Sequence, residues 1–248
     1  MPTRGSAPPA DCQQKKQMHT IDVPSNMKKY FFIYGVAYLL LLTFVCWLLY
    51  AYPKLELHLM LNSHHTGFQD LFFKYYPTLA EWPLYLLALV PLLLKIKKVI
   101  IFFFICEILS GIFVQILKHI VKADRPVRVF EHCQGVVLPV VQGVHLHHSN
   151  SFPSGHTSTF FVFFTCCALM LACYFQASGR HGYKAWLFIV PAMLLLLSMA
   201  ALGAYSRIYL SQHFLSDVCM GSIIGLATPC LLYYFYGNQL LKPKSGLN

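Results

Sequence analysis

Six long apolar runs leave this chain few folds to adopt. They cover residues 30–51, 79–95, 98–118, 156–177, 184–204 and 214–237. A helix that crosses a bilayer needs about 20 apolar residues, and only 11% of the chain is charged, against about 25% in soluble domains. We therefore expect an all-α, polytopic membrane protein with six transmembrane helices. The connecting segment 52–78 carries Pro53 and an aromatic patch, and is expected to contain a short interfacial helix.

The basic residues predict how the chain is oriented in its membrane. There are 19 Lys and Arg against 9 Asp and Glu. When the N-terminus is placed in the cytoplasm, most of the basic residues fall in cytoplasmic segments, as the positive-inside rule requires. Both termini are therefore expected inside, and the charge is assigned to loops and not to nucleic-acid binding. The expected parts are a mobile N-terminal segment over 1–28, a six-helix membrane domain over 29–241 and a cytoplasmic tail over 242–248.

The stretch KHIVKADRP, residues 118–126, ends the third predicted span. Lys118 and Arg125 are seven residues apart, nearly two helical turns, and share a face of the helix if it continues that far. Pro126 disfavours helical backbone at Arg125 and helps to end the segment. Two cations here can bind one anion, although basic residues at a helix end also commonly reach toward lipid headgroups.

The stretch PSGH, residues 153–156, opens the fourth predicted span. Pro153 can start a helix, and Ser154 or Gly155 can leave backbone N–H groups unpaired in its first turn. Such a helix end binds anions through those N–H groups and the helix dipole. An ordinary capped helix would explain the serine and the glycine, but His156 would then project from the first turn without a purpose.

The stretch SRIYLSQHFLSD, residues 206–217, opens the sixth predicted span. His213 and Asp217 stand four residues apart, so on a helix the carboxylate lies beside the imidazole. A carboxylate that holds one ring N–H leaves the other nitrogen available as a base or nucleophile. A buried hydrogen bond with no catalytic role is the alternative, but aspartate in a membrane span is a functional hypothesis by default. Arg207, just before the helix, can reach the same anion.

Six spans would bring these three stretches together. The end of the third span and the starts of the fourth and sixth then lie on one face of the membrane, opposite the termini. Three cations, a helix N-terminus and two histidines converge there. Because like charges repel unless an anion separates them, the sequence predicts a phosphate site.

The three stretches together resemble, in order and spacing, the signature motifs of the type 2 phosphatidic acid phosphatase superfamily. The matching residues are Lys118-x6-Arg125-Pro126, Pro153-Ser154-Gly155-His156 and Ser206-Arg207-x5-His213-x3-Asp217. The resemblance implies that His213 attacks phosphorus and forms a phosphohistidine, that Asp217 orients it, and that His156 protonates the leaving alkoxide. It also implies that no metal or other cofactor is needed. The implied phosphate-binding residues are Lys118, Arg125, Ser154, Gly155 and Arg207.

Two polar features fall outside these motifs. Glu107 lies in the middle of the third span, about 16 Å from Lys118 at 1.5 Å per residue. It is expected either to bond a neighbouring helix or to form a polar floor to a substrate groove. His145, His147 and His148 form a His-rich tract that can bind metal, but their spacing is not that of a common zinc motif.

The resemblance implies a metal-independent membrane lipid phosphatase, acting on a phosphate monoester or diphosphate at the periplasmic face of a bacterial inner membrane. The candidate substrates are lipid A, undecaprenyl diphosphate, phosphatidylglycerophosphate and phosphatidic acid, and the long 127–152 loop favours a bulky headgroup such as that of lipid A. A lipid phosphotransferase, which passes the phosphate to a lipid hydroxyl, is one alternative. A non-enzymatic lipid-binding or transport protein is the other. The oligomeric state is left open.

Overall fold

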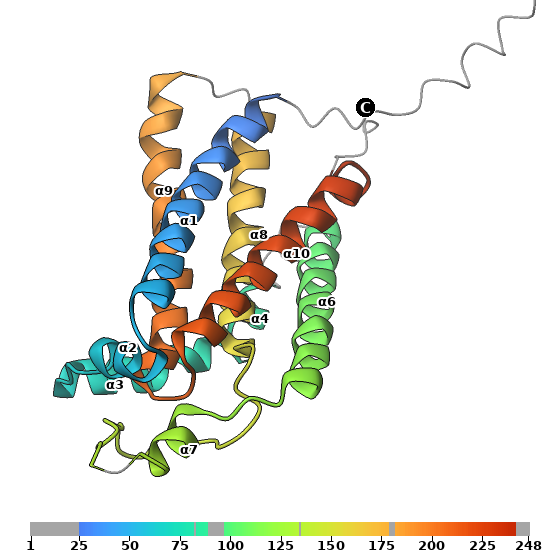
Figure 1. Cartoon of the computed structure of the whole chain (residues 1–248). Helices are drawn as coiled ribbons and strands as arrows, with labels where there is room; N and C mark the ends of the chain where they lie inside the picture. The colour runs from blue at the N-terminus through green and yellow to red at the C-terminus, as the bar shows by residue number, and fades with distance from the viewer. Residues whose placement is uncertain (1–24, 82, 89–96, 134, 179–181, 242–248) are drawn as a thin grey trace, which may run out of the picture.

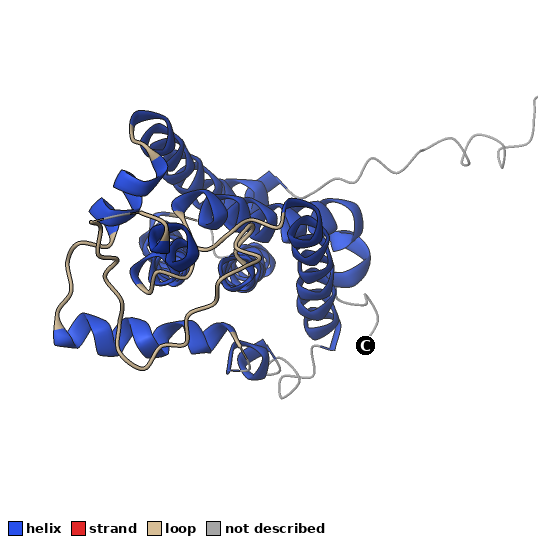
Figure 2. Cartoon of the chain, turned by 60° about the horizontal axis from the view of Figure 1, so that its bottom comes forward, coloured by secondary structure: helices blue, strands red, loops and turns tan. Residues whose placement is uncertain are grey.

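The computed structural model describes residues 25–81, 83–88, 97–133, 135–178 and 182–241, and all regular structure within these ranges is helical (Figures 1 and 2). The predicted all-α class is confirmed. The helices are α1 (Ser25–Ala51), α2 (Lys54–Leu61), α3 (Gly67–Tyr75), the 3-10 helix η3 (Tyr76–Ala80), α4 (Pro83–Ala88), α6 (Lys97–Val121), α7 (Pro126–Glu131), α8 (Gly155–Ala177), α9 (Tyr183–Tyr209) and α10 (Leu215–Leu241).

Within the described ranges, five helices are long and apolar enough to cross a membrane: α1, α6, α8, α9 and α10. The expected second span, 79–95, coincides with the end of η3 and with α4, and residues 89–96 lie outside the described residues. The count of six spans is therefore not confirmed. Where a single interfacial helix was expected, the structure has the two short helices α2 and α3. Of the expected terminal segments, residues 1–24 and 242–248 also lie outside the described residues.

The helix ends that carry the three motifs lie together. Figure 1 shows that α6 and α9 end, and α8 and α10 begin, at the same end of the bundle, where α2, α3 and α7 also lie. The first residues of α1 and the last of α10 lie at the opposite end. Figure 2 brings the first of these ends forward and shows loops crossing over the helix ends. The predicted convergence of the motifs on one face is therefore seen in the fold.

Helix α8 occupies the centre of the bundle. In its most apolar window 56% of the residues are buried, against 11% to 39% in the other four long helices. Two hydroxyl pairs tie α1 to this centre: Tyr34 Oη lies 3.2 Å from Thr165 Oγ1 on α8, and Tyr38 Oη lies 3.1 Å from Ser222 Oγ on α10. Hydrogen bonds of this kind are common between helices in lipid, where neither partner can bond water.

Helices α8 and α10 approach each other through two glycines. A Cβ added at Gly221 would lie 2.6 Å from the carbonyl oxygen of Ser154, and one added at Gly225 would lie 2.5 Å from that of Ser158. Small residues let the backbones of membrane helices pack closely. Here they hold the PSGH turn against the first turns of α10, which contain Asp217.

We expect Gly221→Ala to lower both thermal stability and turnover. The new methyl group meets backbone and not a flexible side chain, so the start of α8 must move away from α10. Overpacking of this kind typically costs about 1–3 kcal/mol. The measurement is thermal unfolding in detergent, with Gly35→Ala as the matched control, because a Cβ at Gly35 on α1 meets nothing within 4 Å. A Gly221→Ala protein as stable and active as the control would show that the close approach is not required.

Candidate active site

The PSGH turn forms the start of α8 as predicted. Ser154 is the N-cap residue, and its hydroxyl oxygen accepts from the Thr157 hydroxyl at 3.0 Å and from the Thr157 backbone N–H at 3.5 Å. In addition, the Ser154 N–H donates to the carbonyl oxygen of Asp217 at 3.0 Å. The backbone N–H groups of Gly155 and His156 are then the first of α8, where a helix has no partners of its own and attracts anions. Ser154 therefore caps α8 and fixes the shape of the turn against α10.

His213 and Asp217 lie together, but not on consecutive turns of one helix. Helix α10 begins at Leu215, so His213 precedes it. Asp217 lies in the first turn of α10 and its Oδ2 accepts from the backbone N–H of Phe214 at 3.0 Å, in the manner of a capping box. His213 Nδ1 lies 3.6 Å from the same Oδ2, and both side chains are only 2% exposed. The turn before α10, and not helical spacing alone, makes this pair.

Sequence reasoning missed a third member of this group, Ser151. Its hydroxyl donates to Asp217 Oδ2 at 2.5 Å and lies 3.5 Å from His213 Nδ1. Ser151 is fully buried and its own N–H is bonded to the carbonyl of Ala123, near the end of the first motif. The one signal in the sequence for Ser151 was its position two residues before PSGH. Serines in polar loops are common, so this position alone could not mark it as a site residue.

Burial holds the pKa of the His213 imidazole well below its usual range, and the nearby Arg125 and Arg207 act in the same direction, while Asp217 opposes them. His213 is therefore neutral at neutral pH. Because its Nδ1 faces Asp217 and Ser151, Nε2 is the nitrogen available for chemistry.

Arg125 reaches the site from a loop. Helix α6 ends at Val121, Lys122 takes a left-handed φ of 47°, and Arg125 is extended as the residue before Pro126. The shared helix face considered for Lys118 and Arg125 is therefore not formed. Arg125 is 8% exposed, and it donates from Nη1 to Gln212 Oε1 at 2.9 Å and from Nε to the carbonyl of Ser149 at 2.9 Å. Gln212, which no sequence signal marked, thus anchors this cation next to His213.

Arg207 lies in the last turn of α9 and is buried at 8% exposure. Its carbonyl oxygen accepts from the N–H groups of Gln212 and His213 at 2.9 and 3.1 Å, so it also fixes the backbone of the histidine. Its Nε is buried without a hydrogen-bond partner among the described residues. An unpartnered donor on a buried cation is costly, and a bound anion would satisfy it.

Lys118 and His156 complete the predicted set. Half-buried Lys118 lies in the last turn of α6 and interacts electrostatically with Arg125, Arg207 and Asp217. His156 interacts with all three cations and with His213. Its Nε2 lies 3.8 Å from Glu81 Oε1, and Glu81, which sequence reasoning missed, is 57% exposed at its side chain. The structure therefore brings all eight predicted site residues to one end of the bundle.

A second buried histidine lies behind the site. His58 on α2 is 1% exposed, its ring packs against Phe130 and Phe214, and neither ring nitrogen has a hydrogen-bond partner in the described part of the chain. Burial lowers the pKa of His58 to about 4 from its usual 6.5. Between about pH 4 and pH 6.5, His58 is therefore neutral in the folded protein and protonated in the unfolded chain.

We expect this histidine to make the protein less stable in mild acid. As the pH falls through 6.5, His58 becomes protonated in the unfolded state, but in the folded state it stays neutral down to about pH 4. Between these values the free energy of unfolding therefore falls by at most about 1.4 kcal/mol per pH unit. His58→Phe should remove this part of the loss. Thermal unfolding of both proteins at pH 7 and pH 5 measures it, and parallel losses in the two proteins would contradict the assignment.

The His-rich tract does not gather into a metal site in the described residues, where no group of three or more His, Cys, Asp or Glu side chains is placed to hold an ion. The rings of His145 and His147 lie 4.8 Å apart, edge to face, and His148 Nε2 lies 3.6 Å from Glu131 Oε1. These contacts organise the loop over the site. Metal independence itself stays a prediction.

Fold and site together define a helical membrane protein with a cluster of largely buried cationic side chains and histidines at one end of its bundle. The profile of the PAP2 superfamily matches residues 99–240, which hold all three motifs, and the chain belongs to that superfamily. It is 33% identical over 103 residues to a PA-phosphatase related-family protein of Dictyostelium discoideum, covering 39% of this chain and 35% of that protein. It is 41% identical over 87 residues to lipid phosphate phosphatase 2 of Arabidopsis thaliana, covering 34% and 29%.

The chain thus spans about a third of the length of these two relatives. Among solved structures, LpxE of Aquifex aeolicus shares the fold, with a TM-score of 0.54 at 23% identity over 72% of this chain and 93% of that chain. This match supports the helical arrangement.

Proposed function

We propose that this protein is a lipid phosphate phosphatase that works through a phosphohistidine, as the motif resemblance implied. The observation that carries the proposal is the buried, unpartnered Nε of Arg207 beside a neutral, nearly inaccessible His213. Lys118 and Arg125 add charge, and the first N–H groups of α8 add donors. Fixed cations and donors are the main requirement of phosphoryl transfer, since negative charge spreads over three oxygens in the transition state.

In the first half of the proposed reaction, His213 Nε2 attacks phosphorus. The P–N bond forms as the P–O bond to the lipid breaks, and His156 gives its proton to the leaving alkoxide. Asp217, held by the Ser151 hydroxyl and the Phe214 N–H, stabilises the positive charge that develops on the His213 ring. Arg207, Lys118 and Arg125 hold the phosphoryl oxygens.

In the second half, water takes the place of the lipid. His156, now neutral, removes a proton as the water oxygen attacks phosphorus, the P–N bond breaks, and inorganic phosphate and neutral His213 remain. If a lipid hydroxyl enters in place of water, the same steps give a phosphotransferase. Only the identity of the acceptor separates these two functions.

The orientation of the site is also part of the proposal. The described ends of the chain lie at the end of the bundle opposite the site, and the positive-inside rule places the termini in the cytoplasm. The site then faces away from the cytoplasm, toward the periplasm if the membrane is the bacterial inner membrane expected from the sequence. Labelling of the half-buried Cys133 thiol in the loop after α7 from the cytoplasmic side only would overturn this orientation.

The test is release of inorganic phosphate by purified protein in detergent with excess EDTA. The panel is lipid A, undecaprenyl diphosphate, phosphatidylglycerophosphate and phosphatidic acid. We expect release from at least one lipid and no effect of EDTA, because Arg and Lys supply the charge that a metal would. Release only when a second lipid with a hydroxyl is added would favour the phosphotransferase, and loss in EDTA would contradict metal independence.

A further inference from the structure

A groove runs between α6 and α8, away from the active site. It has a volume of about 360 Å³ and begins at Gly155, the first residue of α8. On the α6 side it is bordered by Ile108 and Gly111, which are exposed on the surface of the bundle. The groove therefore opens toward the lipid and leads to the start of α8, where the phosphate is proposed to bind.

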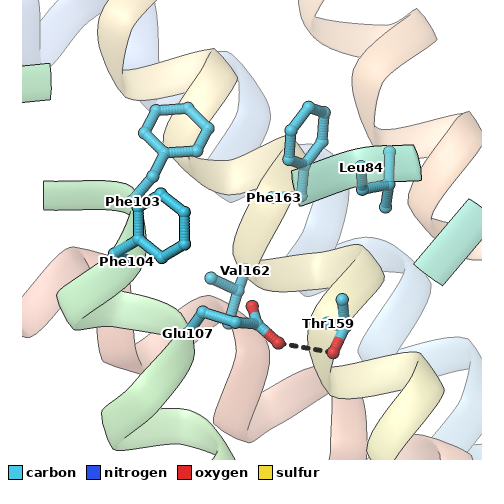
Figure 3. A pocket seen from close by; sticks show the side chains of 7 residues that line it. All are labelled: Leu84, Phe103, Phe104, Glu107, Thr159, Val162 and Phe163. Atoms are coloured by element: carbon cyan, nitrogen blue, oxygen red, sulfur yellow. Dashed lines mark hydrogen bonds between the residues drawn. The ribbon is translucent and has the colours of Figure 1, made fainter. Parts of the chain in front are cut away.

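Two polar pairs cross this groove. Ser110 Oγ and Ser158 Oγ lie 2.5 Å apart. The Thr159 hydroxyl donates to Glu107 Oε1 at 2.5 Å, and Figure 3 shows this second pair. Thr159 is four residues beyond Gly155, or about 6 Å further along α8. The hypothesis that Glu107 bonds a neighbouring helix is confirmed, and the alternative of a polar floor to a substrate groove stays a prediction.

The groove changes character beyond Glu107 and Thr159. A narrower hollow continues from this pair, and its other walls are apolar, formed by Leu84, Phe103, Phe104, Val162 and Phe163 (Figure 3). Along the groove, moving away from the active site, a ligand would first contact cations and backbone N–H groups, then the hydroxyls and Glu107, and finally apolar side chains. This order matches a lipid with a phosphate, a polar linker and an acyl chain.

Helix packing does not by itself require these polar groups. An acidic side chain in a membrane helix is costly and is a functional hypothesis by default, whereas small apolar residues pack helices without that cost. Glu107 is only partly buried and lines the open groove. Its Oε1 accepts a hydrogen bond here, and a hydroxyl or an amide N–H is the kind of group that can donate to such an oxygen.

We infer that Glu107 and Thr159 read the linker of the substrate, and that the preferred substrates are lipid phosphates with a hydroxyl or amide N–H close to the phosphate. This inference rests on the proposed phosphatase activity. Lipids in which a hydrocarbon chain directly follows the phosphate, such as polyprenyl phosphates and diphosphates, would be poor substrates. Glu107 is then a specificity-determining residue and takes no part in the chemistry.

The experiment compares two substrates of equal chain length, a lysophosphatidic acid with a linker hydroxyl and a simple alkyl phosphate without one. A hydrogen bond to a charged group contributes about 1.5–3 kcal/mol, so wild-type kcat/KM should favour the lysolipid by about 10- to 100-fold. In Glu107→Gln and in Thr159→Val this ratio should fall by about tenfold, mainly through KM. The matched controls are Glu56→Gln on α2 and Thr165→Val, a hydroxyl deletion elsewhere on α8, and both should keep the wild-type ratio.

The outcomes separate this inference from the proposed function. A wild-type ratio near one, or an unaltered ratio in both groove variants, would overturn the inference while phosphate release still supported the phosphatase. A fall in the ratio in the controls as well would show a general effect on folding and would also overturn it. Release from neither substrate would overturn the phosphatase proposal and the inference with it.

Discussion

His213→Asn protein should release phosphate at least about 10⁴-fold more slowly than the wild type, which is the scale of loss when a nucleophile is removed. Asparagine cannot form the covalent intermediate, yet its amide fills part of the same buried space and can still bond Ser151 or Asp217. Phe214 N–H continues to bond Asp217, so the start of α10 should keep its conformation. The loss should therefore be chemical and not structural.

Three measurements make this prediction strict. Thermal unfolding should be close to that of the wild type, and substrate binding should persist. Rapid mixing of the wild type with radiolabelled lipid phosphate, followed by quenching at alkaline pH, should trap label on the protein, because phosphohistidine is labile in acid. Trapping the same amount of label on His213→Asn would contradict the assignment of the nucleophile.

Arg207→Lys should lower kcat by about 10²-fold, in the range seen when a single stabilising donor is lost. Lysine keeps the charge but presents a point charge in place of a planar fork. It would also lack the Nε donor that lies buried and unpartnered in this structure. The contacts through the Arg207 carbonyl involve only backbone on its side, so the turn that holds His213 should survive.

The control is Arg128→Lys on α7. Arg128 is half exposed and forms an ion pair at 3.3 Å with Asp124, which lies four residues earlier in the loop before α7, a contact of small energy at a protein surface. Turnover of this variant should be close to that of the wild type. Inhibition by added orthophosphate should weaken in Arg207→Lys and persist in Arg128→Lys. Equal turnover in the two variants would show that Arg207 does not stabilise the phosphoryl group.

The sequence was most informative where chemistry depends on local order. Residue type and spacing were enough to predict that Arg207, His213 and Asp217 share one site, and the alternation of apolar and polar segments placed that site at one end of the bundle. The placement at one end of the bundle needed only the length of a membrane span, whereas His213 and Asp217 meet through the turn before α10 and not through the helix period. The membrane class and the convergence of the three motifs were predictable for the same reason.

Contacts made by irregular backbone were not predictable in this way. Ser151, Gln212 and Glu81 reach the site through loops or helix ends whose course depends on packing, and nothing in their residue types separates them from other polar loop residues. Lys122 in a left-handed conformation ends α6 before Arg125, so helical periodicity gave the wrong geometry for that pair. His58 was missed because an isolated histidine near an interfacial helix has no spacing pattern.

The central position of α8 has a consequence for how this protein can evolve. Its first turn borders α10, where Gly221 admits no side chain, and substitutions on that side disturb catalysis directly. Its other side borders α6, which contributes Lys118 to the site and otherwise only the wall of the groove. Under the proposed function, changes at Glu107, Ser110 or Gly111 would alter which lipid is accepted while His156 and His213 keep their places. Substitutions that change substrate preference should therefore be found mainly on α6.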